Sequence, residues 1–190
     1  MPIFIGALLI VATGLGVLVY RTLLHRLDVR YGRSCANHFN HHQLGLTMAA
    51  NDHPDQILLA TNDARAALLI LDPQFDHPPG WLTNSGSACP ESFIRDGSFG
   101  YVYVGDDLIL GDVVDRGILI LFCANENHRG SWDVARGCFT KDGFTSTSNA
   151  GLIAELERAV SRGQSGEVAY SERAMKVLHS ELEKRRKPVR

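Results

Sequence analysis

The chain has 190 residues, of which 21% are charged, and its formal net charge is −2. A net charge this close to zero gives no electrostatic basis for binding nucleic acid, so we expect no nucleic-acid partner. The mean hydropathy of −0.05 averages an apolar N-terminal stretch with a polar remainder that is long enough for one domain with its own core.

The apolar stretch runs from Ile3 to Tyr20 and contains no charged residue. As a helix it would be roughly 27 Å long, close to the thickness of the hydrocarbon core of a bilayer. The pattern predicts a single transmembrane helix over residues 1–20, with the lipid bilayer as a partner and the inner (cytoplasmic) membrane as the location. A cleaved signal peptide is the alternative, but Tyr20 and the residues after it are not a cleavage site.

Arginines follow the apolar stretch, at Arg21, Arg26, Arg30 and Arg33. Taken literally, the positive-inside rule places this side in the cytoplasm. Removal of a basic leader would change the balance of positive charge between the two sides of the predicted membrane helix. Charge alone therefore leaves the orientation of the helix open. Few helix breakers occur before His53-Pro54, and residues before a proline resist helical geometry. We therefore predict that the helix continues as a spine over residues 21–52.

Residues 53–147 are predicted to form a globular α+β domain. A short helix begins near Ala64 behind the capping residues Thr61-Asn62-Asp63. Strands are expected over residues 100–104, 117–123 and 134–140, because these runs are rich in β-branched and aromatic residues. Residues 148–190 are predicted to close the chain with two helices and a basic tail, the second helix opening at Ser171-Glu172.

Four cysteines are present, Cys35, Cys89, Cys123 and Cys138. No CxxC spacing occurs, which argues against a structural zinc site. An even number of cysteines in an exported domain suggests disulfides. Bridges between Cys123 and Cys138 and between Cys35 and Cys89 would suit the predicted elements, whereas in the cytoplasm all four thiols would stay reduced.

Several stretches in order resemble one family. They are a Ser34-Cys35-Ala36-Asn37-His38 segment, Gln43-Leu44-Gly45-Leu46, Ala50-Asn51-Asp52, Cys89-Pro90, the run from Ser98 to Gly105, Glu126-Asn127-His128-Arg129-Gly130 and Cys138-Phe139-Thr140-Lys141-Asp142-Gly143. Together they resemble the type II secretion pseudopilin or prepilin-like proteins of planctomycetes and verrucomicrobia. The resemblance implies a pilin-like fold, with a membrane helix that continues as a spine on a small antiparallel sheet and a domain outside the cytoplasm.

The chain departs from that family at its beginning and in its last motif. The family has a glutamate at the fifth position and a basic leader, whereas this chain has Ile5 and begins Met1-Pro2-Ile3. In a pilus that glutamate neutralises the amino terminus of a neighbouring subunit, which Ile5 cannot do. Phe144 also replaces the family's histidine after Asp142-Gly143.

Candidate site residues are few. The motif Asn127, His128, Asp142 and Gly143 flanks a predicted hairpin, and Glu126, His128 and Asp142 are weak candidates for a metal such as calcium. We favour the alternative, in which Asn127, His128 and Asp142 fix the loop backbone by hydrogen bonds. The spine histidines His38, His41 and His42 are interpreted as a polar helix face. No catalytic motif occurs, so we expect no enzymatic activity, no cofactor and no small-molecule substrate.

Two functions follow as expectations. The first is a non-enzymatic, membrane-anchored pseudopilin-like assembly protein that acts by helix packing with similar subunits. The second is a single-pass accessory subunit of a larger membrane complex. In the second, helix contacts along Gly6, Gly14 and Gly16 would hold the subunit, because small residues let neighbouring helices approach closely.

Overall fold

The computed structural model describes residues 2–69, 88–89, 93, 97–124, 136–140, 143–147 and 149–187. Within these ranges, the side chains of residues 2–12, 24–34, 36, 136–140, 143–147 and 149 lie outside the description.

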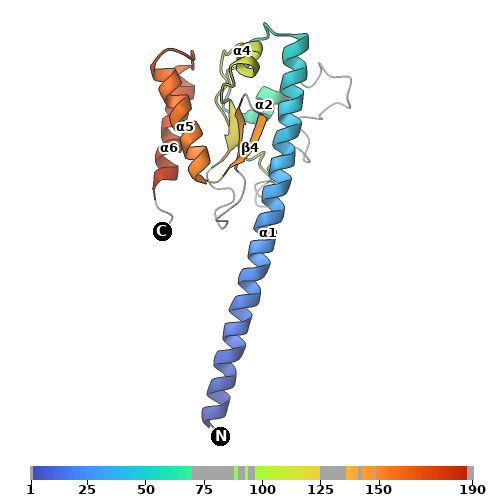
Figure 1. Ribbon diagram of the computed structural model, residues 1–190, viewed down its shortest axis with the longest axis vertical. Helices are drawn as coiled ribbons and strands as arrows, with labels where there is room; N and C mark the ends of the chain where they lie inside the picture. The colour runs from blue at the N-terminus through green and yellow to red at the C-terminus, as the bar shows by residue number, and fades with distance from the viewer. Residues whose placement is uncertain are drawn as a thin grey trace.

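One helix dominates the molecule. Helix α1 (Pro2–Asp52) is roughly 75 Å long at the standard helical rise, and its N-terminal part extends well beyond the rest of the molecule (Figure 1). We call residues 2–23 the arm and residues 35–52 the packed segment. The helix ends at Asp52, immediately before His53-Pro54 as predicted, and the His53 N–H still donates to the Ala49 carbonyl at 2.8 Å.

The predicted membrane anchor requires a correction. A span needs about 20 consecutive apolar residues in one helix. The side chains described on the arm run from Thr13 to Leu23 and include Arg21. Across the described residues, no helix combines the length and the hydropathy needed to cross a bilayer. This finding overturns the predicted fold class, which began with a transmembrane helix, and the predicted location as a single-pass protein of the inner membrane.

A four-stranded antiparallel sheet lies beside α1. Its strands, in spatial order, are β1 (Tyr101–Tyr103), β2 (Leu121–Cys123), β3 (Arg136–Thr140) and β4 (Gly143–Thr147). The sequence predicted β1 and β3 closely and extended β2 too far towards its N-terminal side. It missed β4, because the run Thr145-Ser146-Thr147 gives no alternation of apolar and polar residues.

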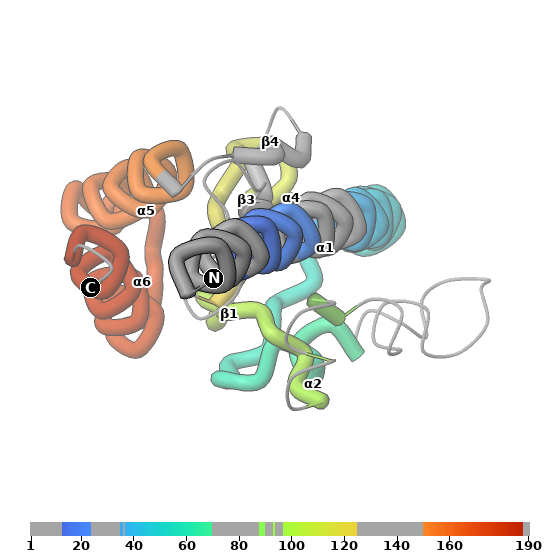
Figure 2. Tube along the Cα trace, turned by 90° about the horizontal axis from the view of Figure 1, so that it is seen from below, coloured from blue at the N-terminus to red at the C-terminus, as the bar shows by residue number. Residues whose placement is uncertain are grey.

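The sheet separates two apolar clusters. Leu121 and Cys123 face the cluster that contains α1, while Phe122 faces the one formed with the C-terminal helices. This alternation follows from the two-residue period of a strand. Because both faces are covered, all three residues of β2 are buried. The molecule therefore has three layers, with α1 on one side of the sheet and a helix pair on the other (Figures 1 and 2).

The helix pair consists of α5 (Asn149–Gln164) and α6 (Glu172–Arg186). Leu152, Leu156 and Leu178 are fully buried between the pair and the sheet. Ser171 caps α6 as predicted, because its hydroxyl accepts from the Ala174 N–H at 3.0 Å. The same hydroxyl donates to Asp106 Oδ2 at 2.7 Å, which joins the start of α6 to the turn after β1.

Two short helices precede and follow β1 in the chain. Helix α2 (Ala64–Leu69) begins behind Asp63, whose carboxylate accepts from the Arg65 N–H at 2.8 Å. Helix α4 (Leu110–Asp115), which the sequence did not predict, packs against α1.

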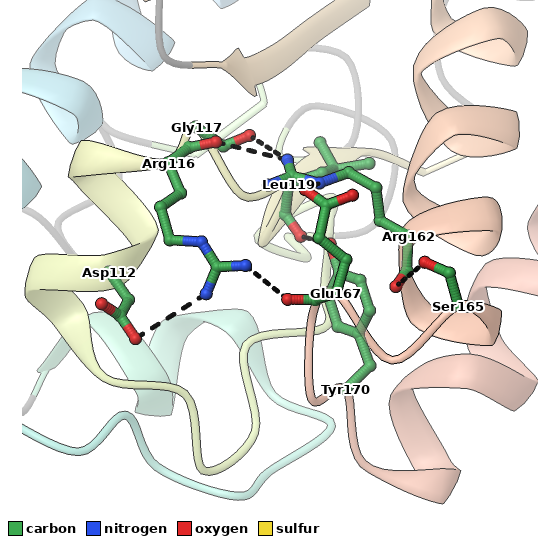
Figure 3. A network of polar contacts seen from close by, with 8 residues as sticks. All are labelled: Asp112, Arg116, Gly117, Leu119, Arg162, Ser165, Glu167 and Tyr170. Carbon is green, nitrogen blue, oxygen red and sulfur yellow. Dashed lines mark hydrogen bonds and ion pairs between the residues drawn. The ribbon is translucent and has the colours of Figure 1, made fainter.

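A polar network ties α4 to the α5–α6 connection. Arg162 donates to the carbonyls of Arg116 and Gly117, at 3.3 and 3.2 Å, and pairs with Glu167 at 2.7 Å. Tyr170 donates to the Leu119 carbonyl at 2.9 Å. Figure 3 shows this network, which holds the helix pair against the segment leading into β2.

Candidate functional site

Three buried cysteines from separate parts of the chain meet on the α1 side of the sheet. Cys35 comes from α1, Cys123 ends β2, and Cys89 lies in a segment between α2 and β1. Their sulfur atoms all lie within 4.8 Å of one another, and Cys35 Sγ is 3.2 Å from Cys123 Sγ. Each of the three residues is 0% exposed. We call these residues the three-thiol cluster.

Regular structure positions two of the three thiols. Cys35, Phe39 and Leu46 are each at most 1% exposed and share one face of α1, since residues four and seven apart recur on the same side of a helix. Cys123 faces α1 because it alternates with Phe122. Its carbonyl is fixed from α6, where Arg185 donates to it at 2.5 Å.

Backbone and side-chain hydrogen bonds position the third thiol. The Cys89 N–H donates to the Phe99 carbonyl at 2.9 Å, next to β1. The adjacent Ala88 carbonyl lies 2.7 Å from His38 Nδ1, one turn after Cys35 on α1. The segment that carries Cys89 is thus tied both to the sheet and to the spine.

Aromatic rings pack around the cluster. Phe39 and Tyr101 meet edge to face with ring centroids 4.7 Å apart, and Phe99 and His42 join the same group. The Tyr101 hydroxyl lies 3.9 Å from Cys35 Sγ. His42, interpreted from sequence as part of a polar face, is 0% exposed. This apolar environment keeps water away from the sulfur atoms.

The environment favours protonated thiols. Hydrogen bonds with Cys123 and Cys89, together with burial, raise the pKa of Cys35 well above its usual value. Burial and the neighbouring cysteines likewise raise the pKa of Tyr101. A reactive cysteine needs a stabilised thiolate and access to its substrate. The raised pKa therefore does not suit nucleophilic catalysis. The close approach of the three sulfur atoms, and not their pKa, is what would suit metal ligation or disulfide formation.

Of the residues in the predicted loop motif and the predicted helix-packing set, the structure describes only the glycines. Glu126, Asn127, His128 and Asp142 lie outside the described residues, and Gly143 is the first residue of β4. Gly6, Gly14 and Gly16 all lie on the arm.

The predicted disulfides stay predictions. Cys35 and Cys89 do lie within 4.8 Å of each other, but Cys123 also lies within 4.8 Å of both. The register of β2 and β3 pairs Cys138 with Phe122 rather than with Cys123. The separation of 3.2 Å between Cys35 Sγ and Cys123 Sγ exceeds the length of a disulfide bond, about 2.05 Å.

Sequence patterns give no direct signal for the three-thiol cluster. No two of its members are close enough in the chain to form a recognisable metal-binding motif. A weak indication was available, because Cys35 falls on the apolar stripe of the spine and Cys123 ends a buried strand.

Comparisons of the chain with protein-family models, curated proteins and solved structures find no significant match.

Proposed function

We propose that this chain is a non-enzymatic structural protein that assembles through its arm, which packs among the arms of other copies. The observation that carries the proposal is the exposure of large apolar side chains on the arm. These side chains are between 52% and 65% exposed, and they are Leu15, Val17, Leu18, Val19, Tyr20 and Leu23.

The exposed apolar residues surround the arm. Successive residues are about 100° apart around a helix, so Leu15, Leu18 and Val19 share one face. Val17 and Tyr20 lie on the opposite face. A helix that is apolar on every side is normally buried on every side. Burial of each such side chain contributes about 1.5–3 kcal/mol. One neighbouring helix covers one face only, so the arm requires several.

Other copies of the same chain are suitable neighbours. Among the described arm side chains, Arg21 carries the sole charge, so identical arms bring little repulsion to the contact. A Cβ added at Gly14 or Gly16 would meet nothing within 4 Å inside the chain. Glycine within a helix lowers the stability of the helix by roughly 0.5–1 kcal/mol relative to alanine. Close approach of a neighbouring helix would explain why glycines occur here despite that loss. The family resemblance, in which helices pack together in an assembly, supports the same proposal.

Sedimentation of the purified full chain tests the proposal. The test variant carries Leu15→Gln, Leu18→Gln and Leu23→Gln, and the matched control carries Leu44→Gln, because Leu44 is 53% exposed on the packed segment of the same helix. We expect the wild type and the control to form oligomers and the arm variant to sediment as a monomer with unchanged helix content. A monomeric wild type, or equal oligomers of all three proteins, would contradict self-assembly through the arm.

A further inference from the structure

The three-thiol cluster joins elements that are far apart in the sequence, in the manner of a structural metal site. It connects α1, the segment of Cys89 and strand β2 at one buried point. Metal–sulfur bonds are about 2.3 Å long, so three sulfur atoms around one ion lie about 4 Å apart. The observed separations, from 3.2 Å up to at most 4.8 Å, bracket that spacing. Small side-chain rotations would therefore bring all three sulfur atoms onto one ion.

A disulfide bond within the cluster is the alternative to a bound ion. It would join two of the sulfur atoms and leave the third thiol buried against the bridge, positioned for thiol–disulfide exchange. An ion uses all three sulfur atoms at once, and it needs no oxidant. The number of thiols therefore favours metal ligation over a bridge.

The ligand set selects the kind of ion. Thiolates bind soft cations such as Cu⁺ and Zn²⁺ in preference to Mg²⁺ or Ca²⁺. Structural zinc is almost always held by four ligands. In the part of the chain that the structure describes, no histidine, aspartate or glutamate joins the three cysteines as a fourth ligand. Aromatic side chains surround the site, so a water ligand is also disfavoured. Cu⁺ accepts two or three sulfur ligands and suits this site better than zinc.

We propose that Cys35, Cys89 and Cys123 form a binding site for a soft monovalent cation, with Cu⁺ as the ion that fits best. Binding forms metal–sulfur bonds and displaces thiol protons to the solvent, with no change of oxidation state. The bound ion would lock the packed segment of α1 to β2 and to the segment of Cys89. This site is independent of assembly through the arm, so either proposal can fail without the other.

Titration of the fully reduced full-length protein with Cu⁺ tests the site. Cu⁺ is supplied anaerobically in competition with a chromophoric Cu⁺ chelator, and a parallel titration uses Zn²⁺. We expect one Cu⁺ per chain, held at least tenfold more tightly than Zn²⁺ against matched chelators. X-ray absorption should show sulfur as the sole ligand type, with more than two sulfur atoms per copper. Absence of Cu⁺ uptake by the reduced wild type, tighter binding of Zn²⁺, or oxygen and nitrogen ligation would overturn the proposal.

Serine variants identify the ligands. Cys35→Ser, Cys89→Ser and Cys123→Ser should each lower the affinity for Cu⁺ by at least tenfold. The control, Cys138→Ser, should retain the wild-type affinity, because β3 places residue 138 opposite Phe122. Circular dichroism establishes whether each variant folds, and the spectroscopy of the wild type does not depend on any variant. An equal loss in Cys138→Ser, or full affinity in a folded Cys89→Ser variant, would refute the three-cysteine site.

Discussion

The arm and the packed segment belong to one uninterrupted helix, yet their side chains have opposite surroundings. On the packed segment, Phe39 and Leu46 are at most 1% exposed against the sheet, whereas on the arm Leu15 and Leu18 are more than 60% exposed. Helical structure alone therefore does not decide which apolar residues are buried. The packed segment finds its apolar partners within its own chain, whereas the arm extends past the domain and its described apolar side chains stay exposed (Figure 1).

The largest contrast should come from truncating one apolar side chain in each region. Phe39→Ala removes a ring that contacts Tyr101 and His42 in the core, and we expect a loss of about 3–5 kcal/mol in the free energy of unfolding. Leu18→Ala should change the unfolding of dilute, monomeric protein by no more than about 0.5 kcal/mol. Urea unfolding followed by circular dichroism measures both. Similar losses for the two variants would show that the arm is also packed within the monomer.

An ion pair at the start of α6 should make the domain sensitive to acid. Burial tends to raise the pKa of Asp106, but hydrogen bonds from Arg173 and Ser171 outweigh it, and the net pKa lies below the usual value. The ion pair therefore stabilises the fold above the unfolded-state pKa, near 3.9. That contribution is lost as the pH falls below this value and through the lower pKa of the folded state.

Asp106→Asn isolates this contribution. The substitution should cost about 1–3 kcal/mol at neutral pH, because it leaves a partly buried arginine without its carboxylate. The difference between the variant and the wild type should shrink as the pH falls below 4. Asp107→Asn serves as the control, since Asp107 is exposed. A difference that is constant from neutral pH to acid would contradict the assignment to this ion pair.

The smallest contrast comes from adding one methyl group to a glycine in each region. At Gly111, in α4, a Cβ would lie 2.9 Å from the Pro54 carbonyl oxygen, whereas at Gly14 it would meet nothing within 4 Å. Gly111→Ala should therefore destabilise the domain by about 1 kcal/mol. Gly14→Ala should favour the helix in the monomer by roughly 0.5–1 kcal/mol and weaken assembly. Hydrogen exchange of the arm measures the stabilisation of its helix by Gly14→Ala. Chemical unfolding measures the destabilisation of the domain by Gly111→Ala. A stabilising Gly111→Ala would contradict the close packing of α4 against Pro54, just after α1.

Local chemistry in the sequence predicted several elements well. The long helix and its end at Asp52 followed from an uninterrupted helical pattern and the His53-Pro54 stop. The start of α6 followed from Ser171, whose hydroxyl does cap the helix. These features depend on residues close together in the chain, so sequence alone was sufficient.

Features that depend on distant residues were not predictable in the same way. Helix α4 is held by hydrogen bonds to Pro54 and Gln56, in the segment just after α1, and β4 is defined by pairing with β3. The three-thiol cluster exists because α1, β2 and the segment of Cys89 meet in space. Hydrophobicity also led to the wrong prediction of a transmembrane helix at the N-terminus. An apolar pattern indicates that a helix packs against partners, but it does not identify those partners.

Photocrosslinking from the arm tests the central claim most directly. A benzophenone amino acid at position 18, in place of Leu18, reacts with whatever lies against the arm, and the same group at position 44 is the control. We predict that position 18 forms covalent dimers whose crosslinks map to residues 2–23 of a second copy, identified by mixing isotope-labelled and unlabelled protein. Position 44 should give no such dimers. Crosslinks from position 18 to lipid, to a different protein or to its own domain would contradict assembly through the arm.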